Sequence, residues 1–332
     1  MFSSFRNYLI TFVISLVIFG LIGYFAVSFG LKSFVPDTII GNGGYIETGI
    51  DTSSETTSSG DKPDFSAING ESFTMILIGT DYRPAVMNDY DVSTFTDGFP
   101  DPKRTIQADT IIIVRLDKEK GECMISAIPS NMSVMVDGVN TQLRELYSEK
   151  NLQFLIDKVS SVTGLKFDYY ACIHIQDFIN IIDKLGGFTF DVPVDMNYTD
   201  HKEGLTISIR KGTKWLDGAT VAKMLRYRGY SDGNISRMNL AVNFLKSVLN
   251  YLTEPQFMSR APELYKGVID YTKTNLWVEN LTAQLDLIYA LPNFTYVDIT
   301  YPGTTKMSGD VEYFEPQISA AIDTYFEYRK QY

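Results

Sequence analysis

The stretch TIIIVRL at residues 110–116 decides the fold, because it is a short and almost unbroken run of apolar, mostly β-branched residues. Two similar runs flank it along the chain, FTMILIG at 73–79 and CMISAIP at 123–129. Short continuous runs of this kind are typical of strands that are buried on both faces. We therefore expect these runs to form a sheet that is covered by helices on each side.

Helical patterns follow the strands. Apolar residues recur at helical spacing in 152–159 and again in 178–185, where the pair Gly186–Gly187 is a stop signal. A longer apolar stripe predicts a helix over 235–252. Further predicted elements are helices at 219–225, 279–290 and 315–328 and a strand at 294–301. The alternation predicts an α/β fold of three layers, with a mixed central sheet and helices on both faces.

The N-terminal region has a different character. Residues 7–31 contain no charge and are dominated by Ile, Leu, Val and Phe. This run of 25 residues is longer than the roughly 20 residues that a membrane-spanning helix needs. A cleaved signal peptide is the alternative, but its apolar region is usually about 7 to 15 residues long and ends in a small-x-small site. We predict a cytoplasmic tail at 1–6, a transmembrane anchor at 7–31, a flexible Ser/Thr/Gly-rich linker at 32–70 and an extracytoplasmic domain at 71–332.

Composition excludes several functions. The 332 residues include 29 Lys and Arg against 40 Asp and Glu, a net charge of −11, which argues against a nucleic-acid partner. Two His and two Cys cannot supply most zinc sites or an iron–sulfur set, so any metal must be bound by oxygen. Cys123 and Cys172 lie in apolar strand runs. They form a disulfide only if those strands are neighbours, and we prefer two buried thiols.

Basic residues concentrate in one segment. Residues 202–246 hold nine basic and three acidic side chains, a local charge of +6, which leaves −17 for the rest. Such a cluster indicates an anion site, because an arginine fork holds two phosphate oxygens at once. A solvated charged face is the alternative interpretation.

Local geometry ranks the arginines and carboxylates. Arg226 and Arg228 would lie about 200° apart on one helix, so they cannot both face one ligand unless the chain is extended there. Gly229 is a plausible helix stop, which lets Arg228 point into a site and leaves the role of Arg226 open. Arg237 falls in the first turn of the next helix, where free N–H groups favour an anion. Asp81 and Asp109 sit at the ends of two predicted strands, and they either cap these ends or hold Mg²⁺ beside a phosphate.

The order of these segments resembles the LytR-CpsA-Psr family of bacterial envelope proteins. The resemblance rests on the anchor, ILIGTDYR at 76–83, ADTIIIVRLD at 108–117, LGGFTFDVPVDM at 185–196 and KGTKWLDGATVAKMLRYR at 211–228. It covers residues 73–326, nearly all of the soluble part.

The resemblance implies a function and a site. Family members are transferases that move a glycopolymer, such as teichoic acid or capsule, from a polyprenyl diphosphate carrier to peptidoglycan outside the cell membrane, in Gram-positive type bacteria. The implied catalytic residues are Asp109, Arg228 and Arg237. The implied diphosphate-binding residues are Arg83, Arg226, Arg228 and Arg237, and Asp81 and Asp109 would hold Mg²⁺.

The chain departs from the family pattern at charged positions. Gln107, Ser130, Asn131, Asn234 and Leu240 stand where the family usually has Arg, Arg, Asp, Asp and Arg. We therefore carry two hypotheses: a membrane-anchored glycopolymer transferase with a reduced set of charges, and a non-catalytic relative that binds lipid-linked glycan or wall precursors. A transcriptional regulator is disfavoured by the anchor and the acidity.

Overall fold

The computed structural model describes residues 70–81, 106–200, 205–232, 234–254, 271–276, 278–309 and 311–329. The predicted membrane span at 7–31, the predicted linker up to residue 69 and Arg83 lie outside these ranges. Within them, no helix combines the length and the apolar character that a membrane span requires.

The described residues form a central sheet in the order β11-β6-β1-β2-β3-β12. Its strands are β1 (Phe73–Thr80), β2 (Ala108–Asp117), β3 (Glu122–Ala127), β6 (Tyr169–His174), β11 (Thr272–Thr274) and β12 (Thr295–Asp298). Strand β2 pairs antiparallel with both β1 and β3, whereas β6 runs parallel to β1 and β12 parallel to β3. The expected mixed sheet is therefore present, and the TIIIVRL run lies near its centre.

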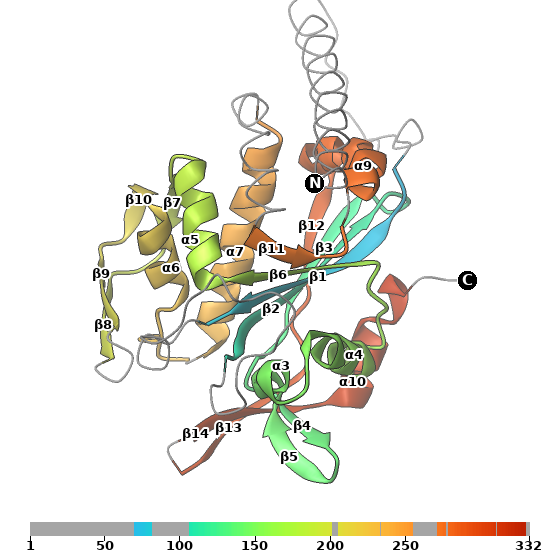
Figure 1. The fold of residues 1–332 in the computed structure, drawn as a ribbon, viewed down its shortest axis with the longest axis vertical. Helices are drawn as coiled ribbons and strands as arrows, with labels where there is room; N and C mark the ends of the chain where they lie inside the picture. Colours follow the sequence, from blue (N-terminus) through green and yellow to red (C-terminus); the bar gives the residue numbers. More distant parts are fainter. Residues whose placement is uncertain are drawn as a thin grey trace, which may run out of the picture. The chain divides into compact units, whose positions relative to one another are not determined.

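Helices cover both faces of this sheet (Figure 1). The helices are α3 (Leu146–Glu149), α4 (Leu152–Thr163), α5 (Ile175–Lys184), α6 (Gly218–Leu225), α7 (Asn234–Leu252), α9 (Val278–Ala290) and α10 (Ile318–Thr324). Ile111 and Ile113 of β2 belong to a core cluster that includes residues of α4 and α10. Ile112 and Val114 belong to the opposite cluster, which includes residues of α7 and α9. The alternation explains why the run is apolar at every position, and it confirms three layers.

A second packing unit lies beside the sheet. Its short strands are β7 (Phe188–Val192), β8 (Met196–Asp200), β9 (Leu205–Ile209) and β10 (Gly212–Leu216), paired as β7 with β10 and β8 with β9. Their buried side chains form one cluster with residues of α5, α6 and α7, and Figure 1 shows these elements gathered on one side. The same cluster includes the buried side chain of Tyr227, in the turn between α6 and α7.

Two hairpins complete the fold, and one of them corrects a prediction. The first joins β4 (Ser133–Val136) to β5 (Val139–Gln142), and the second joins β13 (Gly303–Ser308) to β14 (Val311–Pro316). The predicted helix at 315–328 is wrong at its start, because Glu315 and Pro316 pair with Thr304 and Gly303 in the second hairpin. The helix that follows, α10, is shorter than expected and gives way to a 3₁₀ turn, η5, at Phe326–Tyr328.

The two cysteines are unpaired and buried, as preferred from the sequence. Cys123 lies on β3 and Cys172 on β6, and strands β1 and β2 separate them in the sheet. Burial raises the pKa of each thiol to about 12, so both are protonated and inert near neutral pH.

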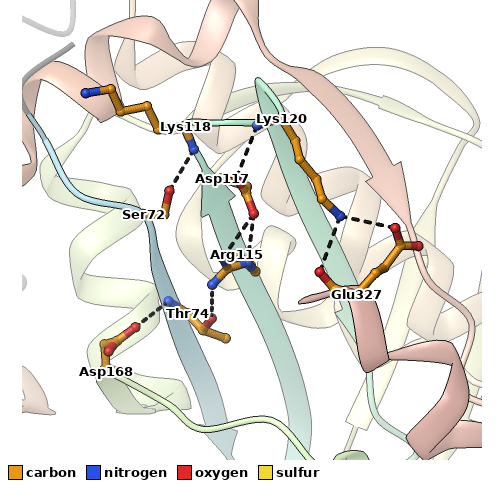
Figure 2. A network of polar contacts seen from close by, with 8 residues as sticks. All are labelled: Ser72, Thr74, Arg115, Asp117, Lys118, Lys120, Asp168 and Glu327. Atoms are coloured by element: carbon orange, nitrogen blue, oxygen red, sulfur yellow. Dashed lines mark hydrogen bonds and ion pairs between the residues drawn. The ribbon is translucent and has the colours of Figure 1, made fainter. Parts of the chain in front are cut away.

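A buried ion pair within β2 belongs to a polar network that crosses the sheet (Figure 2). Arg115 and Asp117 of β2 are each 6% exposed, and Nε and Nη2 of Arg115 donate to Oδ2 of Asp117 at 3.3 and 3.0 Å. Nη1 of Arg115 donates to Oγ1 of Thr74 on β1 at 3.1 Å. The Thr74 amide in turn donates to Asp168 at 2.8 Å, just before β6. The network ties three neighbouring strands together through polar groups that are removed from water.

Asp117→Ala should lower the free energy of unfolding by about 3 kcal/mol, because it leaves the Arg115 charge buried without its carboxylate. Urea unfolding of the two proteins measures the difference. Glu327→Ala, which removes the exposed pair between Lys120 and Glu327, is the control and should cost less than about 1 kcal/mol. Equal, small losses in both variants would contradict the structural role of the buried pair.

Candidate functional site

The candidate site lies at one edge of the central sheet. Because β2 runs antiparallel to β1 and β3, its first residues lie beside the last residues of those two strands. Asp109 is therefore near Asp81, which follows Thr80, and near the segment that follows Ala127. The amides at this edge are paired: Asp81 N donates to Gln107 O at 2.9 Å, and Gln107 N donates to Oδ1 of Asp81 at 2.7 Å. Asp81 thus fixes the entry of the chain into β2.

Two predicted arginines reach Asp109 from the turn between α6 and α7. Helix α6 ends with Arg226 as its C-cap, so Arg228 leaves the helix and its Nη2 lies 3.7 Å from Oδ2 of Asp109. Arg237 in the first turn of α7 donates from Nη2 to the main-chain oxygen of Asp109 at 3.4 Å. The three residues expected to be catalytic are therefore brought together. Arg226 is half-buried at the end of α6, and Arg83 lies outside the described residues.

A third arginine, Arg144, was not predicted from the sequence. It lies in the 3₁₀ turn η3 (Leu143–Glu145), and its Nη1 is 3.7 Å from Oδ1 of Asp109. The segment LRELYSEK around it reads as an ordinary charged helix surface, so no local signal marks Arg144. Its position depends on a tertiary backbone contact, in which Arg144 N donates to Ser130 O at 2.8 Å.

A chain of amide side chains holds Arg237 from the other side. Nε of Arg237 donates to Oδ1 of Asn234 at 2.7 Å, and Nδ2 of Asn234 donates to Oδ1 of Asn131 at 3.3 Å. Nδ2 of Asn131 donates to Oε1 of Glu312 on β14 at 3.0 Å. The two asparagines thus connect a carboxylate at one end to a guanidinium at the other, with every amide dipole aligned in the same sense.

Positive charge predominates in this cluster. Arg144, Arg228 and Arg237 surround the single carboxylate of Asp109, and Glu312 acts from the far end of the amide chain. Burial lowers the pKa of Arg237 to about 10; Asp109 opposes this shift, and the neighbouring Arg228 and Arg144 add to it. Arg237 stays charged at neutral pH but is held among like charges, an arrangement that an added anion would relieve.

Several polar atoms here are buried and lack a hydrogen-bond partner among the described residues. They include Oδ1 of Asp109, Oγ of Ser130 and Nε of Arg144. A small pocket, partly open to solvent, adjoins Asp109 and Ser130. Its lining combines polar Asp109, Ser130 and Arg237 with apolar side chains from β2, β3, α6 and α7: Ile111, Ile112, Ala127, Ile128, Leu225, Met238 and Ala241. The site therefore combines positively charged side chains with an apolar wall.

The fit to a metal ion rests on Asp109. Its Oδ1 atom is a hard acceptor without a hydrogen bond, which suits Mg²⁺, because this ion takes one or two carboxylates and completes its shell with water and phosphate. Across the described ranges, no group of three or more His, Cys, Asp or Glu side chains is arranged to hold a metal by itself.

The model of the LytR_cpsA_psr family matches residues 44–327. The polyisoprenyl-teichoic acid–peptidoglycan teichoic acid transferase TagU of Bacillus subtilis is 22% identical over 221 residues, which are 65% of this chain and 70% of TagU. The chain spans only 53% and 54% of relatives from Staphylococcus aureus and Streptococcus mutans.

Solved structures show the same fold. The crystal structure of Bacillus subtilis TagV superposes with a TM-score of 0.61 at 18% identity, over 79% of this chain and 99% of TagV. A structure described as TagT bound to LI-WTA superposes with a TM-score of 0.55 at 16% identity, over 80% of this chain and 92% of that one.

Asn131→Asp would place a second carboxylate against Glu312, so the free energy of unfolding should fall by about 1 to 3 kcal/mol at pH 8. The two carboxylates would raise each other's pKa, and protonation at pH 5 should therefore restore part of the loss.

Thermal melts at the two pH values measure this effect. Asn140→Asp, an exposed change of the same charge on β5, should shift stability by less than about 0.5 kcal/mol at both. A loss in Asn131→Asp that is independent of pH would show that the contact with Glu312 does not carry the effect.

Proposed function

The chain belongs to the LytR-CpsA-Psr family, and we propose that it is a membrane-anchored transferase that moves a glycopolymer from a polyprenyl diphosphate carrier to peptidoglycan. The observation that carries the proposal is the cluster of three arginines around Asp109, in which positive charges outnumber negative ones. The similarity to TagU, a polyisoprenyl-teichoic acid–peptidoglycan teichoic acid transferase, supports the substrate class.

The arginines suit a diphosphate for a chemical reason. During transfer, the acceptor hydroxyl forms a bond to the transferred group while the bond from that group to the carrier's phosphate breaks. Negative charge then grows on the departing phosphate, and fixed cations in a partly dry site stabilise that charge without reorganising. Arg228 and Arg237 come from two ends of one turn, so they can contact different oxygens. Helix α7 begins beside them, and its free N–H groups add a favourable dipole.

Asp109 has a positioning role in this proposal. Its carboxylate lies between Arg144 and Arg228, and its main-chain oxygen accepts from Arg237, so one residue orients all three guanidiniums. A Mg²⁺ ion would be held by Asp109 and Asp81 together with phosphate oxygens, and it would supply further neutralisation of the diphosphate. The apolar wall formed by Ile112, Leu225 and Met238 lies where the hydrocarbon next to the diphosphate would begin.

The alternative is a protein that binds lipid-linked glycan without transferring it. The amides Asn131 and Asn234 favour this alternative, because neither can act as a base on an acceptor hydroxyl or as a charged metal ligand. In this case the arginine cluster would bind the same diphosphate, and only the transfer step would be missing.

A transfer assay decides between the two. Full-length protein in detergent would be incubated with a radiolabelled lipid-linked glycopolymer, Mg²⁺ and peptidoglycan, and label in the insoluble wall fraction would be counted. Arg228→Ala should lower the transfer rate by about 100-fold, because it removes one preorganised donor. Arg210→Ala, an exposed arginine at the end of β9, is the matched control and should keep the wild-type rate.

Binding of the labelled carrier without any transfer by the wild-type protein would reject the transferase and leave the binding function. A wild-type rate in Arg228→Ala would instead remove Arg228 from the site.

A further inference from the structure

The main chain around Arg144 is fixed on both sides. Leu143, which is fully buried, donates its amide to Met132 O at 2.8 Å, and Arg144 donates its own to Ser130 O at 2.8 Å. The turn is also closed by Glu145, whose side chain accepts from Gln142 N at 3.2 Å. Arg144 is therefore held against the segment that follows β3, and its side chain extends toward Asp109 from a rigid base.

The Arg144 side chain is placed for a ligand that is not a protein group. Its side chain is 19% exposed, and its ion pair with Asp109 is long, at 3.7 Å, compared with the roughly 2.7 to 2.9 Å of a full charge-assisted bond. Its Nε is buried and has no hydrogen-bond partner within the described part of the chain. A guanidinium carries five N–H donors, so Arg144 has donors to spare.

Ser130 provides a second and independent observation. The residue is 2% exposed and lines the same cavity as Asp109 and Arg237, yet its hydroxyl has no partner among the residues that the structure describes. Buried hydroxyls in folded proteins are normally hydrogen-bonded, so an orphan that lines a cavity indicates a bound group that would complete it.

The charge of the cluster identifies the class of that group. Arg144 and Arg228 share the Asp109 carboxylate, and Arg237 contacts only the main-chain oxygen of Asp109. The unpaired donors of Arg144 and Ser130 add to those of Arg228 and Arg237. A single carboxylate ligand would satisfy one arginine fork, whereas two linked tetrahedral phosphates present enough oxygens for all of these donors.

We propose that Arg144 and Ser130 form a second phosphate position in this site, so that Arg144 is a third diphosphate-binding arginine and Ser130 donates its hydroxyl to a phosphate oxygen. The inference rests on the proposed function in taking a diphosphate as the ligand. It assigns one phosphate to Arg144 and Ser130 and the other to Arg228 and Arg237.

Calorimetric titration of the full chain in detergent tests the assignment with three probes: inorganic phosphate, inorganic pyrophosphate and geranylgeranyl diphosphate. Arg144→Gln should lower the affinity for both diphosphates by roughly 10- to 100-fold. Its affinity for inorganic phosphate should fall much less, because the phosphate position at Arg228 and Arg237 is intact. Arg144→Lys should show a smaller loss, since it keeps the charge but not the fork. Arg210→Gln, the exposed control, should stay within about twofold of the wild type.

Ser130→Ala separates binding from folding. It removes a buried hydroxyl that has no partner in the free protein, so the unfolding temperature should be unchanged or raised while pyrophosphate affinity falls. A drop in both stability and affinity would instead mean that Ser130 has a structural role, and it would overturn this half of the assignment.

The outcomes distinguish this inference from the proposed function. Wild-type affinity for both diphosphates in Arg144→Gln overturns the role of Arg144 and leaves the transfer assay unaffected. An equal loss for phosphate and pyrophosphate also overturns it, because it denies a separate second position. If Arg144→Gln loses affinity for pyrophosphate but not for phosphate, and the wild-type protein transfers no glycopolymer, the assignment of Arg144 stands and the transferase function is rejected. Failure of the wild-type protein to bind either diphosphate overturns both.

Discussion

Burial of β2 on both faces is the constraint on which the rest of the structure depends. Ile111 and Ile113 pack with α4 and α10, and Ile112 and Val114 pack with α7 and α9. A register slip of one residue would exchange these two sets and would also move the Arg115–Asp117 pair to the opposite face of the sheet. The register is therefore strongly specified, and it places Asp109 at the edge of the sheet where α7 begins.

The site gathers charges that would repel one another without such a scaffold. Arg144, Arg228 and Arg237 arrive from three different segments, and none of them makes a short ion pair with Asp109. Both ion pairs to the Asp109 carboxylate are 3.7 Å long, so the arginines are held near the carboxylate without being saturated by it. The chain Arg237–Asn234–Asn131–Glu312 brings in a distant carboxylate without placing a second negative charge in the pocket. The result is a preorganised positive site, as expected for the binding of a small polyanion.

Much of the fold followed from periodicity, because a strand buried on both faces and an amphipathic helix each have a clear pattern. The runs at 73–79, 110–116 and 123–129 are strands, and the helices at 219–225, 235–252 and 279–290 agree within a few residues with α6, α7 and α9. The hairpin that holds Glu315 and Pro316 escaped prediction because its exposed strands bury little and have no strong alternation. Arg228 and Arg237 were found because helix ends are legible in sequence, whereas Arg144 was missed because only the tertiary contact with Ser130 brings it to Asp109.

The most direct test of the central claim is a crystal structure of the full chain with geranylgeranyl diphosphate. We predict that the diphosphate lies beside Asp109, with phosphate oxygens within about 2.7 to 3.2 Å of guanidinium nitrogens of Arg228 and Arg237. Its hydrocarbon should begin along Ile112, Leu225 and Met238. A diphosphate bound elsewhere on the protein, with the guanidiniums still facing only Asp109, would contradict the account.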